Sequence, residues 1–414
     1  MYEQTPAPHT PGPAPRAGWR GVSRTVWALG VTSFVTDISS EMITSVLPLY
    51  LVIYRQMTPL AYGSVDGLYQ AGAALVRVGS GLIADRSQRH KAIATTGYGL
   101  SALAKLAYAA GPAWSMLLAA VTLDRVGKGL RTAPRDAMIA AATPRAMAAT
   151  AFGVHRALDA AGAALGPFIT FAILALVPGG YDQVFLVSFV CALVGVASLT
   201  LLVDVPPALA PVRLSLLGHA RAALRTPGFG RVAAGAALVS LVSISDGLIY
   251  LVAQQQTAFT PGRLPLLFVG TQASYFLLAG PLGAVADRLG TRGMFLAGQG
   301  ALIAVYVVLW RGVGSITGLA VVLLALGAYY AATDGVLTAM ASRLLPAEAR
   351  ASGLGLLATC TTTARGLAAL LFGALWTATS ANTALAWFLG TACLAVATTA
   401  VVLPREAPPT EVAA

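Results

Sequence analysis

Twelve apolar runs, each long enough to cross a membrane as a helix, follow one another along the chain and constrain its fold more than any other feature. The hydrocarbon core of a bilayer is ~30 Å thick, so a spanning helix needs about 20 apolar residues. Hydrophobic residues make up 57% of the 414 positions and charged residues 10%, too little charge to cover a soluble surface. The sequence therefore predicts an all-α polytopic membrane protein. The runs lie at residues 27–51, 62–84, 92–110, 114–130, 152–177, 184–203, 232–251, 264–286, 294–310, 316–340, 354–376 and 383–403.

An internal repeat divides these runs into two sets of six. The motif that begins at Gly81 recurs at Gly283, 202 positions later, and the same offset relates other landmarks: Asp85 to Asp287, Arg86 to Arg288, Pro144 to Pro346 and Gly153 to Gly355. Two such halves in the same orientation are related by an axis along the membrane normal, and they place a substrate site between them near the midplane. The repeat predicts two pseudo-symmetric six-helix bundles.

The composition of the remaining segments completes the domain organisation. We expect a disordered N-terminal tail at 1–24, a first bundle at 25–203, a Pro- and Arg-containing linker at 204–231, a second bundle at 232–403 and a C-terminal tail at 404–414.

Lysine and arginine are distributed unevenly between the loops on the two sides of the predicted membrane. Only Arg55, Arg263 and Arg311 fall on the side opposite the N-terminus. Cytoplasmic loops carry an excess of positive charge, so both termini and the linker are predicted to be cytoplasmic. The net charge of +11 is scattered between apolar runs, which argues against a nucleic-acid partner.

Three phrases resemble those of a known family. The residues Gly81, Ala84, Asp85, Arg86, Arg89 and Lys91 resemble the signature between helices two and three of the major facilitator superfamily, with Gln88 in place of its usual glycine. The phrases at 36–42 (TDISSEM), in the first helix, and 124–136 (DRVGKGLRTAPRD), after the fourth, are similar to a bacterial branch of that superfamily. The resemblance implies alternating-access secondary transport across a bacterial inner (plasma) membrane. It also implies that Gly81, Asp85, Arg86, Asp287 and Arg288 act in gating, through contacts that hold the inner side closed.

A glycine pattern in the fifth run bears on the direction of transport. Gly153, Gly162, Gly166 and Pro167 match most of the superfamily's antiporter motif, although its closing glycine pair would fall at Thr170-Phe171. Glycines one turn apart also let a second helix approach closely, and proline bends a helix. Both the antiporter reading and simple helix packing remain open.

Two carboxylates in the first run are candidates for proton coupling. Asp37 and Glu41 stand four residues apart and share one helix face. Neighbouring carboxylates in a low-dielectric cavity raise each other's proton affinity, so the pair is suited to load and release a proton. The alternative for Asp37 is a structural carboxylate that hydrogen-bonds a neighbouring helix.

Other charges inside apolar runs predict a polar central cavity, because an unpaired charge costs at least ~2.5–3.5 kcal/mol at the bilayer centre. We expect Arg125, Asp246, Asp334 and Arg365 to line it. Simpler roles are expected for other groups: Asp124 pairing with Lys128, Asp159 pairing with Arg156, Lys105 extending to the membrane surface, and His155 at a hydrated helix end.

Several functional classes lack their motifs. The chain has no phosphate-binding loop for an ATP-driven pump and no zinc-protease or nucleophile-elbow motif for an enzyme, and we expect no cofactor and no metal. The prediction is a monomeric proton-coupled antiporter that exports small amphiphilic or organic molecules across the lipid bilayer. The alternatives are a proton symporter for an anionic metabolite or metal chelate attracted to Arg365, and a non-transporting receptor or lipid scramblase on the same scaffold.

Overall fold

Long helices account for nearly all of the residues that the structure describes. The computed structural model describes residues 21–87, 89–109, 113–144, 147–204, 223–257 and 259–404, and these ranges contain no β-strand. The elements are α1 (Arg24–Pro48), a π-helical turn η2 (Leu49–Tyr54), α2 (Pro59–Ser87), α3 (His90–Ala109), α4 (Trp114–Ala141), α5 (Ala148–Leu176), α6 (Tyr181–Leu202), α8 (Phe229–Ser240), α9 (Asp246–Gln256), a 3-10 turn η4 (Pro261–Arg263), α10 (Pro265–Leu289), α11 (Thr291–Arg311), α12 (Ile316–Leu344), α13 (Ala347–Ala378) and α14 (Ala381–Val402). The predicted all-α architecture is confirmed. Most of the expected tails and linker lies outside the described residues, at 1–20, 205–222 and 405–414.

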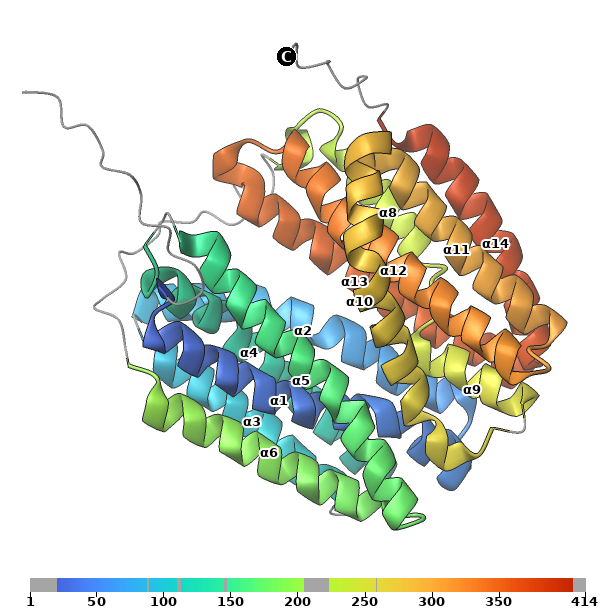
Figure 1. Cartoon of the computed structure of the whole chain (residues 1–414), viewed down its shortest axis with the longest axis horizontal. Coiled ribbons are helices and arrows are strands. Elements are labelled where there is room, and N and C mark those ends of the chain that lie inside the picture. Colours follow the sequence, from blue (N-terminus) through green and yellow to red (C-terminus); the bar gives the residue numbers. More distant parts are fainter. Residues whose placement is uncertain are drawn as a thin grey trace, which may run out of the picture.

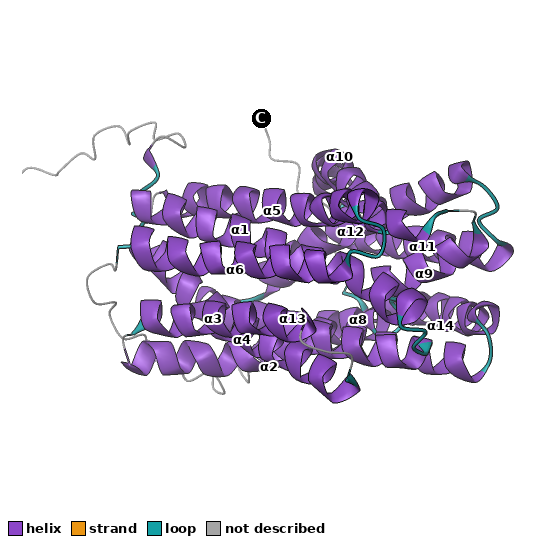
Figure 2. Cartoon of the chain, turned by 90° about the horizontal axis from the view of Figure 1, so that it is seen from below, coloured by secondary structure: helices purple, strands orange, loops and turns teal. Residues whose placement is uncertain are grey.

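The helices form two groups. In the first, α1 packs on α5 and α6, and α3 packs on α4 and α6; in the second, α12 packs on α10 and α11, and α14 packs on α8, α11 and α13. Figure 1 shows the two groups as separate bundles whose ribbons diverge toward the left of the view, and Figure 2 shows their helices running alongside one another with short connections at the ends.

The bundles meet along α2 and α13, and along α5 and α10. Backbones come close where glycines face one another: a Cβ added at Gly67 would lie 2.6 Å from the carbonyl oxygen of Gly366. Nearby, the Leu60 N–H donates to the Thr377 hydroxyl at 2.8 Å. These contacts join the first turns of α2 to the last turns of α13, so they hold the bundles together at the end opposite the start of α1.

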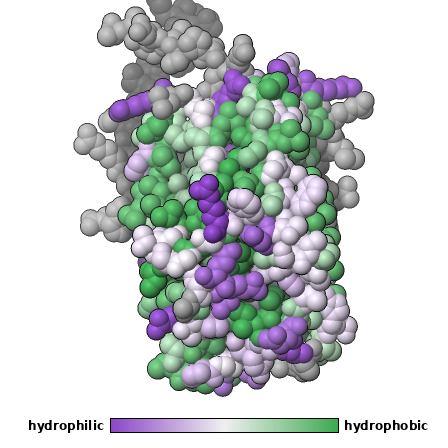
Figure 3. Space-filling model, turned by 90° about the vertical axis from the view of Figure 1, so that its right-hand side faces the viewer, coloured by the Kyte–Doolittle hydropathy of each residue, from purple (hydrophilic) through white to green (hydrophobic). Residues whose placement is uncertain are grey.

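The apolar surface fits a membrane environment. Among the described residues, seven helices are long and apolar enough to cross a bilayer by length and composition, namely α5, α6 and α10 to α14. The helices α1 to α4 are not in this set, and α1 and α4 carry charged residues in their apolar runs, among them Asp37, Glu41, Asp124 and Arg125. On the face shown in Figure 3, apolar and weakly polar side chains predominate and strongly hydrophilic ones form a few separate patches.

The fourth helix extends beyond its predicted end. We expected it to stop at residue 130 and the 124–136 phrase to follow it, but α4 continues to Ala141 and contains the whole phrase. The helix continues because its charged residues have partners inside the bundle. The Arg131 guanidinium donates to the Ser101 hydroxyl at 3.0 Å and lies 4.7 Å from the Tyr98 ring centroid.

The seventh predicted helix, 232–251, is interrupted. Its residues belong to α8 and α9, which are separated by an irregular segment at 241–245. Tyr306 of α11 satisfies the backbone there: its hydroxyl accepts from the Ile244 N–H at 2.7 Å and donates to the Val242 carbonyl at 2.9 Å. Irregular backbone at membrane depth is tolerated where it is buried in protein or lines a cavity. The break therefore points to the central cavity.

Candidate substrate cavity

A cavity of about 370 Å³ lies between the two bundles. The first bundle contributes α1, α2 and α5 to its lining, and the second contributes the 241–245 break, α9, α10, α12 and α13. Its polar and aromatic lining consists of Glu41, Thr44, Tyr62, Asp66, Gln70, Ser243, Ser245, Asp246, Phe268, Thr271, Gln272, Tyr275, Tyr329, Tyr330, Asp334 and Arg365.

The wall of the second bundle is a connected polar network. Arg365 of α13 lies 3.4 Å from the Asp334 carboxylate of α12 and donates to the Tyr329 hydroxyl at 3.3 Å. The Tyr330 hydroxyl donates to Asp246 at 2.7 Å. Three of the four expected cavity residues, Asp246, Asp334 and Arg365, therefore share one wall.

The wall of the first bundle carries Glu41, Thr44, Asp66 and Gln70. The Thr44 hydroxyl shares a 2.6 Å hydrogen bond with the hydroxyl of Tyr69, a residue one layer behind the wall. This tyrosine connects the cavity surface to the interior of the bundle.

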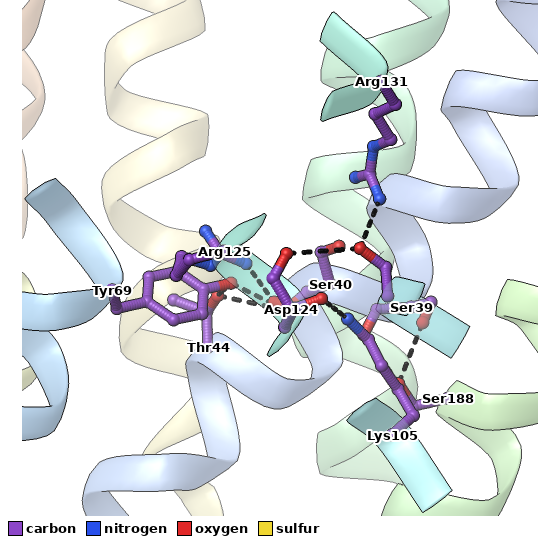
Figure 4. Close-up of polar contacts among 10 residues, drawn as sticks. Ser39, Ser40, Thr44, Tyr69, Lys105, Asp124, Arg125, Arg131 and Ser188 are labelled. Atoms are coloured by element: carbon purple, nitrogen blue, oxygen red, sulfur yellow. Dashed lines mark hydrogen bonds and ion pairs between the residues drawn. The ribbon is translucent and has the colours of Figure 1, made fainter. Parts of the chain in front are cut away.

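Arg125, the fourth expected cavity residue, lies behind this wall. Its guanidinium stacks on the Tyr69 ring at 3.4 Å from the centroid and is 3% exposed. It forms a salt bridge with Asp124, which forms a second one with Lys105 of α3 (Figure 4). The expected Asp124–Lys128 pair and the extension of Lys105 to the membrane surface are both wrong, because Lys105 is 1% exposed and bound to Asp124. Figure 4 shows Asp124 between its two cations, so this group anchors α3, α4 and α2 and does not line the cavity.

The two candidate coupling carboxylates lie in different surroundings. Glu41 lines the cavity. Asp37, one turn earlier, has its carboxyl group close enough to that of Asp159 on α5 for the two to interact. Asp159 also lies 3.9 Å from Arg135 of α4, which differs from the expected local pairing with Arg156.

A second buried polar cluster surrounds this pair. Arg135 donates to the Ser33 hydroxyl at 3.1 Å, and that hydroxyl is 2.9 Å from Nε2 of His155. His155 is 2% exposed, so its expected hydrated position at a helix end is wrong. The cluster links α1, α4 and α5 next to Asp37.

The glycines of the antiporter-like pattern differ in their surroundings. A Cβ added at Gly166 would lie 2.7 Å from the Ile38 carbonyl and 2.8 Å from the Glu41 Cβ, whereas none would meet an atom within 4 Å at Gly153. Gly162 similarly contacts the backbone of Phe34. Close packing of α1 on α5 thus explains Gly162 and Gly166, and Pro167 beside them lines the cavity.

The residues expected to act in gating lie at the helix ends remote from the bundle contacts. Gly81, Asp85 and Arg86 fall near the end of α2, and their side chains are outside the described part of the structure. In the second copy, Asp287 lies 3.9 Å from Arg343, and both side chains are more than half exposed. Gly290 has φ of +94°, a conformation that favours glycine, and it separates α10 from α11.

Asp66, Tyr62 and Gln70 were missed by sequence reasoning. Asp66 stands only four residues after the start of the predicted second run, where an acid looks like part of a hydrated helix end. The available signal was the presence of an acid inside an apolar run. Within the described residues, no group of three His, Cys, Asp or Glu side chains is arranged to hold a metal ion.

The fold and the cavity together define a polytopic helical membrane protein with a polar cavity between two bundles. The family model of the Major Facilitator Superfamily matches residues 29–255, more than half of the chain, and the chain belongs to that family. It is 27% identical over 365 residues to an uncharacterized MFS-type transporter of Methanocaldococcus jannaschii, covering 86% of this chain and 89% of that relative. It is also 27% identical to an uncharacterized protein of Mycobacterium tuberculosis, covering 83% of both.

Solved structures show the same fold. The nucleoside transporter NupG superposes with a TM-score of 0.78 at 14% identity, covering 93% of this chain and all of NupG. A mutant of the peptide transporter POT superposes with a TM-score of 0.75, also at 14% identity, covering 94% of this chain and 95% of that one. At these identities the likeness concerns the fold. The chain is an MFS-type membrane transporter.

Proposed function

We propose that this transporter is a proton-coupled antiporter that exports small amphiphilic or organic molecules by alternating access. The observation that carries the proposal is the position of Glu41 on the wall of the cavity between the bundles, in a helix that also presents Asp37 one turn away. A carboxylate on the wall of the substrate cavity can bind either a proton or a substrate. Because the two compete for the same group, binding of one releases the other.

Asp37 extends this site toward the N-terminal end of α1. Its carboxyl group lies close to that of Asp159, and two neighbouring carboxyl groups in a low-dielectric site favour a proton on one of them. Asp37 and Glu41 together provide two sites for a proton, one next to Asp159 and one in the cavity. This arrangement supports their proposed role as the proton carriers.

The positive-inside distribution supports a cytoplasmic N-terminus and a bacterial inner-membrane location. The bundle contacts in the first turns of α2 would then close the outer side, with the cavity reached from the cytoplasm. Asp287, Arg288 and their counterparts in the first half would lie at the cytoplasmic ends, where we propose that they act in gating.

Uptake of an anion by symport is the weaker alternative. Among the described residues, Arg365 is the only one that brings a guanidinium or ammonium group to the lining of this cavity, and it already lies 3.4 Å from Asp334. An anionic substrate would have to displace that carboxylate.

The test is counterflow of candidate organic compounds in proteoliposomes, with and without an imposed pH gradient. We expect transport to rise with the gradient, and Glu41→Gln to abolish the rise while membrane insertion is retained. Asp182→Asn, which changes an exposed acid at the start of α6, is the matched control. Full gradient-driven transport by Asp37→Asn and Glu41→Gln together would overturn the assignment of the carriers, and indifference of the unaltered protein to the gradient would overturn proton coupling.

A further inference from the structure

The lining of the cavity is rich in negative charge. The described residues contribute four carboxyl groups to it, from Glu41, Asp66, Asp246 and Asp334, and a single guanidinium, from Arg365. Charges at membrane depth are expensive unless they are paired or hydrated, so each carboxylate requires an explanation.

Cations of the protein lie within electrostatic reach of all four carboxylates, but they are not shared equally. Asp334 is paired with Arg365 at 3.4 Å. Glu41 is close enough to Lys128 and Arg125 to interact with both electrostatically. Asp334 therefore has its charge matched by a salt bridge, and Glu41 has two cations of its own bundle within reach.

Asp66 and Asp246 each interact with one cation beyond salt-bridge distance, Arg125 and Arg365 respectively, and these guanidiniums are already paired with Asp124 and Asp334. Neither forms a salt bridge with a described residue, and Asp246 receives one hydrogen bond, from Tyr330. Asp66 is 8% exposed, and its Oδ2 atom has no hydrogen-bond partner among the described residues although the side chain lines the cavity. An unpaired buried carboxylate is costly, and a bound cation removes that cost.

The two aspartates come from opposite bundles and face the same space. Tyr62, one turn before Asp66 on α2, packs on Gly247, the residue that follows Asp246. Asp66 and Asp246 lie close enough to repel each other electrostatically. A cation between them would contact both bundles at once.

The rest of the wall suits an organic cation better than a bare metal ion. Tyr62, Phe268, Tyr275, Tyr329 and Tyr330 supply aromatic rings, and Tyr329 and Tyr330 contact each other with ring centroids 4.9 Å apart. Aromatic faces attract organic ammonium and similar cations through their quadrupole. A metal ion would instead require a convergent set of oxygen ligands.

We propose that the substrates of this cavity are organic cations, and that Asp66 and Asp246 provide the negative charges that bind them from the two bundles. The inference rests on the proposed function only in treating the cavity as the substrate site. Cation binding requires neither proton coupling nor a direction of transport.

The test measures equilibrium binding to the purified full chain in lipid nanodiscs by dialysis, with empty nanodiscs as the blank. Tetraphenylphosphonium and tetraphenylborate, measured separately, have nearly the same shape and opposite charge. We expect saturable binding of the phosphonium and none of the borate above the blank. Asp66→Asn with Asp246→Asn should weaken phosphonium binding at least about tenfold, the equivalent of ~1.4 kcal/mol.

The controls separate charge from folding. Asp182→Asn should leave phosphonium affinity unchanged, and Asp66→Glu, which keeps the charge, should bind more tightly than Asp66→Asn. Each variant is compared as a monodisperse sample by gel filtration; if the double variant does not fold, the comparison of Asp66→Glu with Asp66→Asn decides the matter.

Equal binding of the borate, no saturable binding of the phosphonium, or unchanged affinity in the Asn variants would overturn the inference. These failures are distinguishable from failure of the proposed function. The binding assay contains no gradient, so loss of proton coupling would leave its result intact, whereas gradient-driven counterflow without phosphonium binding would overturn only the inference.

Discussion

Lys105 on α3 and Asp124 on α4 form a salt bridge in the interior of the first bundle, with both side chains about 1% exposed. Arg125 bonds to the same carboxylate, so two cations share one anion. Breaking a buried ion pair by removing one partner is strongly destabilising because the other charge is left uncompensated.

The shared anion makes the cluster asymmetric. Asp124→Asn leaves two buried cations side by side and should lower the free energy of unfolding by about 3–5 kcal/mol. Lys105→Met leaves one cation with one anion, so its loss should be smaller. Unfolding in mixed micelles, followed by circular dichroism, compares the two. Equal losses would contradict this account of the cluster.

The close packing of α1 on α5 predicts that an added methyl group lowers stability at one glycine of α5 and not at another. Gly166→Ala places a Cβ 2.7 Å from the Ile38 carbonyl, and overpacking of this kind costs about 1–3 kcal/mol. Gly153→Ala meets open space and should leave thermal stability unchanged or slightly improved. The melting temperatures of the two variants provide the measurement. If the Gly153 variant were the less stable, packing would not be the reason for this glycine pattern.

The interrupted helix between α8 and α9 depends on one hydroxyl group. Tyr306→Phe removes the acceptor of the Ile244 N–H and the donor to the Val242 carbonyl. Each buried polar group left without a partner costs about 1–3 kcal/mol, so a clear loss of thermal stability is expected. Tyr54→Phe, at a tyrosine that is 58% exposed, is the matched control. Identical melting temperatures would mean that water replaces the hydroxyl.

The exposed pair of Asp287 and Arg343 predicts a kinetic effect without a stability effect. Their separation of 3.9 Å and high exposure imply a contribution of about 0–1 kcal/mol. If Asp287 acts in gating, as we propose, Asp287→Asn should slow counterflow and leave the order of preferred substrates unchanged. A changed substrate range at an unchanged rate would point to a different role.

The sequence predicted the architecture because a bilayer imposes a strong length and polarity requirement on each helix. The runs and the repeat led to the correct all-α fold. The end of α4 was misjudged because Arg131 and Arg135, which have partners inside the bundle, look like loop residues in a linear sequence. The break at 241–245 carries no proline or glycine, and the hydroxyl that satisfies its backbone belongs to Tyr306, on another helix.

The cavity was only partly predictable. Asp246, Asp334 and Arg365 stood out as charges within apolar runs, and all three line it. Arg125 stood out for the same reason but points to Tyr69 and Asp124 instead. The rotation of each helix about its axis decides between these outcomes, and it depends on packing against other helices. Asp66 was overlooked because its place near a helix start suggested hydration.

The irregular segment between α8 and α9 gives the two halves of the transporter different mechanical properties. The first bundle is cross-linked by buried ion pairs and should move as a stiff block. In the second, the seventh span is jointed at the depth of the cavity, directly before Asp246, so α9 can change its angle to α8 without breaking a continuous ladder of helical hydrogen bonds. A molecule bound at Asp246 would therefore act directly on the first residue of α9. We expect bending within one half of the transporter to occur at this break, in the second half.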